Sequence, residues 1–161
     1  MTQPAQISQI AVVVYDLEKA MKAYHDMLGW GPFNVYEHVP PALHDTHLRG
    51  RPTKYSMLGA ETKVQGMGFE IIQPLDGPSI YREWLDTYGE GFHHLAVMKH
   101  TPEESEQFKK DMASRGATIL MGGRIGETIE YYYLDTVPSL KIVVESGSGH
   151  AIDLKPSRVF P

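Results

Sequence analysis

Four side chains that can bind a metal ion occupy matching positions in two similar halves of the chain. Gln9 and His94 each open an apolar run, and Glu70 and Glu145 each lie in the last apolar run of their half. Because side chains alternate along a strand, one position per strand can face a shared concave surface. If the halves are related by a pseudo-twofold axis, a carboxamide, an imidazole and two carboxylates converge on one point.

An oxygen and nitrogen donor set of this kind suits Zn, Co, Ni, Mn or Mg, and the sequence does not choose among them. Four protein ligands leave one or two positions for water or substrate oxygens, as a catalytic metal requires. Each residue alone also has a plain structural explanation, since a glutamine that opens a strand is commonly a solvated end. A buried, unpaired carboxylate is costly, however. Two glutamates at matching positions therefore favour the metal site.

The match between the halves extends to their elements. Residues 9–31 align without gaps on residues 94–116 with six identities in 23 pairs. Each half combines a buried strand, a helix and three further strands. The sequence thus predicts an α+β fold, in which two tandem βαβββ modules form a curved mixed sheet around a metal-binding cavity. We expect a single domain over residues 1–161, with modules at 6–76 and 90–147 and an extended tail at 148–161.

Strand positions follow from the hydrophobic pattern, which places strands near 7–14, 33–39, 54–58, 67–72, 92–98, 118–122, 128–134 and 140–145. Helices are expected from Asp16 to Gly29, from Ser79 to Tyr88 and from Thr101 to Gly116. Between the second and third strands, Pro40 and Pro41 begin what the composition predicts to be a polar loop.

Four segments carry a resemblance to a known family, at residues 9–18, 69–75, 89–96 and 142–145. The third, Gly-Glu-Gly-Phe-His-His-Leu-Ala, is the most specific. On these segments the chain resembles the vicinal oxygen chelate superfamily, which includes glyoxalase I, methylmalonyl-CoA epimerase, extradiol dioxygenases and antibiotic-resistance proteins. The glyoxalase I and epimerase-like branch is the nearest in motif. The resemblance implies the fold, a divalent metal and a homodimer.

Mapped residue by residue, the family's metal ligands fall on Gln9, Glu70, His94 and Glu145. Most members carry histidine at the first position, and this departure disfavours an extradiol dioxygenase, which uses two histidines and one carboxylate for Fe(II). The adjacent His93 is expected to face the other side of the strand, with a packing or hydrogen-bonding role.

In this family a carboxylate can act as the base, so Glu145 and Glu70 are the catalytic candidates. Epimerases add a second carboxylate on the third strand. That place falls at or beside Tyr55, in a strand with no Asp or Glu, so Tyr55 is the remaining candidate for an acid or hydrogen-bond donor.

Candidates for substrate binding lie mainly in the segment from 38 to 51. They are His38, His44, His47 and Arg49, with Tyr133 added from the later strand 131–133, in which alternate tyrosines are expected to face the cavity and a helix. Loops on rigid scaffolds carry specificity, although a solvated polar loop explains the same composition.

Together these features predict a divalent-metal-dependent isomerase, epimerase or lyase that moves a proton α to a carbonyl through a metal-stabilised enolate or enediolate. The expected partner is a small carbonyl or thioester substrate. Two alternatives remain open, namely an extradiol-type ring-cleaving dioxygenase and a non-catalytic protein that binds a small molecule.

Composition limits the remaining classes. The chain has 161 residues, 15 Lys and Arg against 20 Asp and Glu, and no cysteine. The net charge of −5 argues against a nucleic-acid surface. Absent cysteine excludes disulfides, thiolate metal sites and Fe–S clusters. The apolar runs are too short to span a bilayer, and no secretory signal is visible at the start of the sequence, so a cytoplasmic location is expected.

Overall fold

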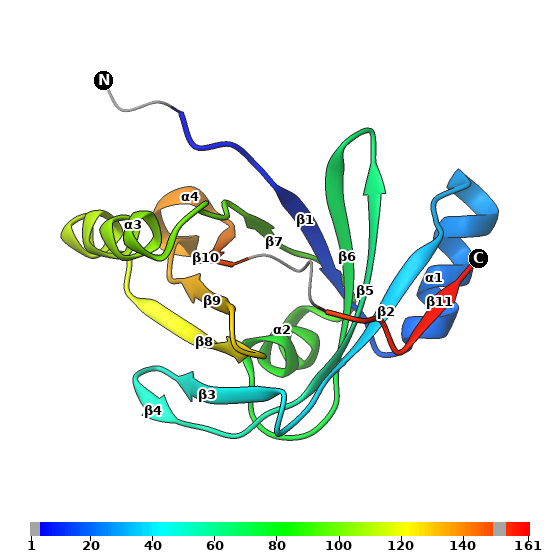
Figure 1. The fold of residues 1–161 in the computed structure, drawn as a ribbon, viewed down its shortest axis with the longest axis horizontal. Coiled ribbons are helices and arrows are strands. Elements are labelled where there is room, and N and C mark those ends of the chain that lie inside the picture. Colours follow the sequence, from blue (N-terminus) through cyan, green and yellow to red (C-terminus); the bar gives the residue numbers. More distant parts are fainter. Residues whose placement is uncertain (1–3, 150–153) are drawn as a thin grey trace.

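Alternating strands and helices build the chain, and the computed structural model describes residues 4–149 and 154–161 (Figure 1). The first half contains β1 (Gln9–Val13), α1 (Leu17–Leu28), β2 (Phe33–His38), β3 (Leu43–Leu48), β4 (Arg51–Pro52), β5 (Met57–Val64) and β6 (Met67–Pro74). The second half contains α2 (Ile80–Tyr88), β7 (Gly91–Ala96), α3 (Pro102–Ser114), β8 (Ile119–Ile125), β9 (Ile129–Leu134), α4 (Val137–Leu140), β10 (Val143–Ser148) and β11 (Arg158–Phe160).

All of these strands belong to one 11-stranded mixed sheet, ordered β11-β2-β5-β6-β1-β7-β10-β9-β8-β3-β4. The halves meet at the antiparallel pair β1–β7, which we call the seam. On each side of the seam the next pair is parallel, β1 with β6 and β7 with β10. The sheet curves without closing (Figure 1). The prediction of an α+β fold with a curved mixed sheet is therefore confirmed.

Alternation along the strands divides the core between the two faces of the sheet. On β6, Ile71 packs in a cluster with Leu17 and Met21 of α1, whereas Ile72 packs in a cluster with Tyr81 of α2. Within β9, Tyr131 and Tyr133 join the α2 cluster, and Tyr132 faces Phe108 and Met112 of α3. The expected alternation of these tyrosines is confirmed.

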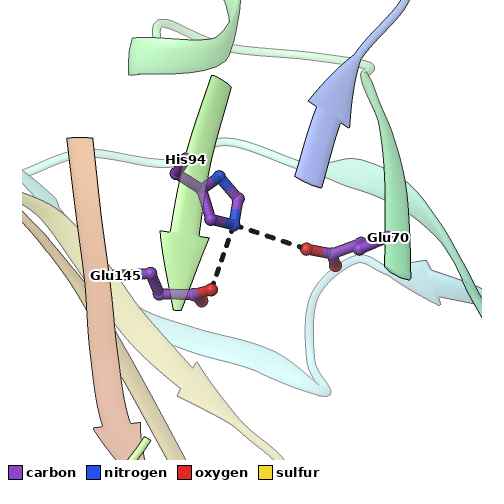
Figure 2. Close-up of side chains that lie close together, drawn as sticks. All are labelled: Glu70, His94 and Glu145. Carbon is purple, nitrogen blue, oxygen red and sulfur yellow. Dashed lines mark ion pairs between the residues drawn. The ribbon is translucent and has the colours of Figure 1, made fainter. Parts of the chain in front are cut away.

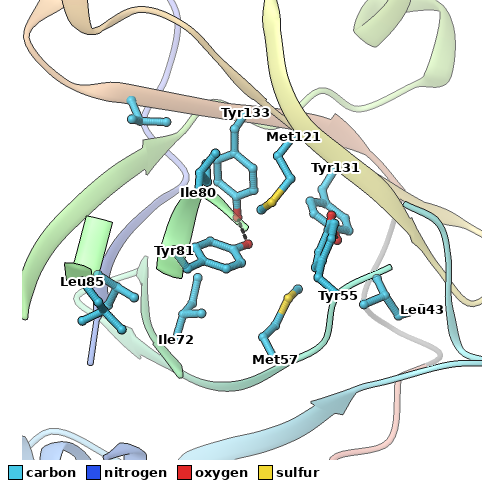
Figure 3. Close-up of a cluster of buried hydrophobic side chains, with 12 residues drawn as sticks. Leu43, Tyr55, Met57, Ile72, Ile80, Tyr81, Leu85, Met121, Tyr131 and Tyr133 are labelled. Atoms are coloured by element: carbon cyan, nitrogen blue, oxygen red, sulfur yellow. Dashed lines mark hydrogen bonds between the residues drawn. The ribbon is translucent and has the colours of Figure 1, made fainter. Parts of the chain in front are cut away.

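The cluster beneath α2 fills much of the concave face (Figure 3). Two pairs of tyrosine hydroxyls form hydrogen bonds inside this cluster. The hydroxyls of Tyr81 and Tyr133 lie 2.6 Å apart, and those of Tyr55 and Tyr131 also lie 2.6 Å apart. These bonds satisfy polar groups that would be costly to bury alone.

The polar loop expected after Pro40 is wrong, because this segment forms the hairpin β3–β4. Strand β3 crosses to the second half and pairs antiparallel with β8, through Leu43 with Ile125 and Leu48 with Met121. Polar residues dominate the hairpin because it lies at the edge of the sheet, although Leu43 enters the core and Leu48 packs against it. Strands at the edge of a sheet commonly contain many polar residues, so a search for hydrophobic patterns does not detect them.

The prediction of the third strand of the first module near residues 54–58 is also wrong. The strand begins at Met57, two residues after Tyr55, and continues to Val64. Gly59, Ala60 and Glu61 interrupt the apolar pattern, yet β5 lies between β2 and β6, and both neighbours pair with it along this stretch. The extended tail contains β11, which pairs with β2, and the strand expected from Leu140 begins instead at Val143, after the short helix α4.

Candidate functional site

Glu70, His94 and Glu145 come together on the concave side, where β6, β7 and β10 meet (Figure 2). One ligand atom of each lies within 4.8 Å of the others. His94 Nε2 lies 3.1 Å from Glu145 Oε2 and 3.7 Å from Glu70 Oε2. All three residues are buried, and His94 is fully so. The structure thus brings together three of the four expected metal ligands.

The register of the sheet explains this convergence. Ala11 on β1 pairs with Glu70 on one side and with His94 on the other, and its small side chain leaves room above the seam. Glu145 pairs with Ala96 on β7. The three side chains therefore stand on one face of the four consecutive strands β6, β1, β7 and β10.

The residues present fit a divalent ion. His94 Nε2 and Glu145 Oε2 are buried without a hydrogen-bond partner among the described residues, although they lie 3.1 Å apart. Donor atoms that bind one ion at 2.0–2.2 Å stand roughly 3.0–3.5 Å apart, which this pair matches. Buried polar atoms are almost always satisfied in native proteins, and these two atoms contact each other only as an ion pair, so a bound cation would satisfy both.

Gln9 stands where pseudo-symmetry requires the fourth donor. It pairs with Gly68 on β6, two residues before Glu70, and His94 pairs with Val143 on β10, two residues before Glu145. A side chain at position 68 would collide with Gln9 Cβ and Cγ, at 3.2 Å each. The half-buried Gln9 thus occupies the equivalent place on β1.

Glu61 is the site residue that the sequence analysis missed. It lies on β5 directly opposite Glu70, so both side chains face the concave side. Burial, and then the charges of Glu70 and Glu145, raise the pKa of Glu61 to about 8. The third strand therefore does contain a carboxylate, and it lies beside Glu70. Extending the strand past Gly59 would have revealed it.

The cluster is electrostatically unbalanced without a cation. Burial alone would lower the pKa of His94, but Glu145 and Glu70 raise it to about 9. Burial raises the pKa of Glu70, and the neighbouring His94 opposes this rise. Three carboxylates, Glu61, Glu70 and Glu145, share this region, and a bound dication would relieve their repulsion.

His93 does not face the other side of the strand, and that expectation is wrong. A β-bulge interrupts the seam between Ala11 and Val12, which pair with His94 and Phe92, so His93 is the extra residue. A bulge breaks the alternation of side chains. The His93 ring lies against the rings of Tyr81 and Tyr133, and its Nδ1 is 2.9 Å from His94 Nδ1.

Two of the expected substrate-binding residues lie near this cluster. Tyr133 is buried, with its ring centre 5.0 Å from that of His94. His38 is also buried, and burial lowers its pKa to about 4 although the charge of Glu145 acts in the opposite direction. A Cβ at Gly59 would lie 3.3 Å from His38 Nε2 and 3.5 Å from Glu70 Oε1, so the imidazole and the carboxylate flank the same glycine.

Tyr55 lies farther along the concave face, among the buried tyrosines (Figure 3). Its hydroxyl donates to the carbonyl of Gly122 at 2.9 Å and meets Tyr131. Burial raises its pKa above the usual range. Both partners tie Tyr55 to the second half of the sheet.

The remaining loop residues are engaged at the edge hairpin. His44 contacts Asp45 and the carbonyl of Gly126, and His47 contacts the backbone of Asp45. Arg49 donates two hydrogen bonds of 2.7 Å to Glu83 of α2. None of these three joins the group of Glu70, His94 and Glu145.

A family model, described as "Glyoxalase/Bleomycin resistance protein/Dioxygenase superfamily", matches residues 8–133. The chain belongs to this superfamily, which is the vicinal oxygen chelate fold expected from the sequence. A comparison with curated proteins gives no match.

Solved structures of the same fold include methylmalonyl-CoA epimerases. The enzyme from Mycobacterium tuberculosis is 17% identical, with a TM-score of 0.63 and 93% of each chain covered. A Streptomyces coelicolor epimerase in complex with 2-nitronate-propionyl-CoA is 18% identical, with a TM-score of 0.61, and covers 93% of this chain and 98% of its own. In the part of the chain that the structure describes, no helix is long and apolar enough to cross a membrane.

Proposed function

We propose that this protein holds one divalent metal ion through Glu70, His94 and Glu145, with Gln9 as a fourth donor, and moves a proton α to a substrate carbonyl. The observation that carries the proposal is a pair of buried atoms, His94 Nε2 and Glu145 Oε2, which lack hydrogen-bond partners in the described part of the chain and belong to a group able to hold a metal.

The proposed reaction proceeds by general acid–base catalysis. A divalent ion in this place supplies Lewis-acid stabilisation of the negative charge that develops on a carbonyl oxygen. The Glu61 carboxylate takes the proton from the α-carbon, and its raised pKa suits a group that must hold that proton near neutral pH. Glu145, on the opposite side of the seam, is the second group able to carry a proton.

Two carboxylates on different strands favour epimerisation within this class. Inversion at a carbon requires that a proton leave one face and return to the other, which needs two groups. Glu61 on β5 and Glu145 on β10 stand on either side of the central strands β6, β1 and β7. We therefore propose a 2-substituted acyl thioester or a related carbonyl acid as substrate, in keeping with the acyl-CoA ligand of the similar Streptomyces enzyme.

His38 and Tyr133 complete the proposed substrate site. Both are buried beside the ligands and neither carries charge at neutral pH. They can orient a substrate oxygen without adding to the charge of the carboxylates. His44, His47 and Arg49 lie at the hairpin, where they can contact only a part of the substrate that extends away from the metal.

The test joins metal content to proton exchange. Protein purified without chelator should contain one divalent ion per chain, and methylmalonyl-CoA and other 2-substituted acyl thioesters should exchange their α-proton with deuterated water under anaerobic conditions. Mass spectrometry follows the exchange. Metal-free protein and Glu61→Gln protein serve as controls.

Two results would overturn the proposal. Absence of stoichiometric metal would remove its basis and favour a protein that only binds a small molecule. Turnover that consumes oxygen and requires iron would favour the dioxygenase alternative.

A further inference from the structure

The contact between the neighbouring rings of His93 and His94 has a chemical consequence. Their Nδ1 atoms lie 2.9 Å apart, and the rings are nearly perpendicular at 88°. Two ring nitrogens at this distance share one proton, so one must donate and the other must accept. Both rings are buried, with 1% and 0% of their surface exposed, so water does not offer an alternative partner.

The role of His94 decides the direction of this bond. His94 Nε2 points at the oxygens of Glu145 and Glu70, 3.1 and 3.7 Å away. An imidazole that binds a metal through Nε2 carries its proton on Nδ1. His94 must then donate to His93 Nδ1, and His93 must carry its own proton on Nε2.

We propose that His93 is a positioning residue, which fixes the tautomer and ring orientation of His94 for metal binding. The inference rests on the proposed metal site but adds a residue that does not touch the metal. Ligand histidines commonly donate their second N–H to a carboxylate, a carbonyl or water. Here the neutral imidazole of His93 accepts that hydrogen bond. The acceptor therefore adds no negative charge to a site that already holds Glu61, Glu70 and Glu145.

The β-bulge makes this arrangement possible. Along a regular strand, adjacent side chains point to opposite faces, and their rings cannot meet. The extra residue opposite Ala11 and Val12 breaks the alternation at His93. The bulge therefore turns a sequence neighbour of the ligand into its hydrogen-bond partner.

Aromatic rings on three sides hold His93 in place. Its ring centre lies 5.4 Å from Tyr81, 5.3 Å from Trp84 and 6.1 Å from Tyr133. The first two belong to α2, which joins the two halves of the chain. Through His93, the orientation of a metal ligand thus depends on the packing of the connecting helix.

NMR of protein labelled with ¹⁵N-histidine tests the tautomers directly on the wild-type chain. We expect Nδ1 of His94 to be protonated and Nδ1 of His93 to be unprotonated in the protein loaded with Zn²⁺. A proton on Nδ1 of His93 in that state would overturn the inference. Zn²⁺ binding without α-proton exchange would leave this inference standing while the proposed reaction fails, and an absence of Zn²⁺ binding would overturn both.

A matched pair of substitutions tests the effect on the metal. Asparagine places its side-chain oxygen near the position of histidine Nδ1, and leucine has nearly the same shape without an acceptor. We expect His93→Leu to weaken Zn²⁺ binding about 10- to 100-fold in a chelator competition, whereas His93→Asn stays close to wild type. His100→Leu, on an exposed loop, is the control.

Equal Zn²⁺ affinity in the leucine and asparagine variants would overturn the inference, because the acceptor would then have no effect. Thermal unfolding of the metal-free variants separates loss of fold from loss of affinity. If neither variant folds, the tautomers of the wild-type protein decide the question.

Discussion

Glu61 and Glu145 both belong to the carboxylates of the site, but their expected functions differ. Among the described residues Glu145 Oε2 has no hydrogen-bond partner, and it stands 3.1 Å from His94 Nε2, as a metal ligand would. Glu61 lies outside the group that could hold a metal and opposite Glu70 on the neighbouring strand. Substitution by glutamine preserves the shape of each and removes its charge, so it separates binding from proton transfer.

For Glu61→Gln we expect α-proton exchange to fall by about 10²-fold or more with metal content unchanged, since a general base contributes on that order. For Glu145→Gln we expect both exchange and metal affinity to fall. Exchange rates by mass spectrometry and metal analysis of the same samples check both. Loss of metal in Glu61→Gln would contradict the assignment of roles.

The carboxylates also predict how stability depends on pH. The pKa of Glu61 is about 8 in the folded protein against 4.5 for a free glutamate, so the folded state binds more protons between these values. The free energy of unfolding of metal-free protein should therefore decrease as the pH rises from about 5 to 8. The raised pKa of His94 acts in the same direction, up to about pH 9.

Denaturant unfolding at several pH values measures this slope. Glu61→Gln should flatten it, and bound Zn²⁺ should oppose it, because a cation favours the ionised carboxylates. A metal-free protein that becomes more stable between pH 5 and 8 would contradict the electrostatic description of the site.

At the scale of the elements, the hairpin β3–β4 is the feature that sequence patterns did not show. Periodicity placed the helices and most strands because their apolar residues repeat with the period of the element. Periodicity failed for β3, which lies next to the edge strand of the sheet. It also failed for β5, where Gly59 and Glu61 lie beside the candidate site and interrupt the apolar pattern. The repeat pairs the residues that we propose as metal ligands, so the sequence alone singles them out, whereas Glu61 has no carboxylate counterpart in the second half.

Side-chain contacts of Arg49 and Tyr55 tie the hairpin and the segment after it to the rest of the chain, and we expect them to differ in strength. The Arg49–Glu83 pair is about half exposed, so Arg49→Met should cost less than about 1 kcal/mol. The Tyr55 hydroxyl is buried against Gly122 and Tyr131. Tyr55→Phe leaves both partners unsatisfied and should cost about 1–3 kcal/mol.

Chemical denaturation of the two variants gives this comparison. Proton exchange by Tyr55→Phe then tests the other role suggested for this residue. A large loss of exchange without a loss of stability would place the Tyr55 hydroxyl in catalysis, and the opposite result would make it a structural contact.

At the scale of the whole molecule, the site lies across the seam. Glu70 comes from the first half, and His94 and Glu145 come from the second. A metal ion bound there contacts both halves, so its binding free energy adds directly to the stability of their association.

Removal of the metal should consequently lower the midpoint of thermal unfolding. A ligand present at about 100 times its Kd stabilises the folded state by about 2.7 kcal/mol. For a chain of this size that corresponds to about 5–10 °C. Calorimetry with and without chelator measures the shift, and Glu70→Gln with Glu145→Gln in one chain should abolish it. An unchanged midpoint in the wild-type protein would show that no metal joins the halves.

The crossing of β3 to β8 bears on how copies of this chain can assemble. Proteins made of two similar modules can undergo domain swapping, because the same seam can form within one chain or between two chains. Here a second ladder, β3 with β8, also joins residues of the first half to the second within one chain. An exchanged dimer would have to break and remake both ladders together. If the protein forms the homodimer that the family resemblance implies, we therefore expect two intact copies side by side. Mixing two samples that carry different isotope labels tests this, because intact subunits should dissociate and form mixed dimers without unfolding.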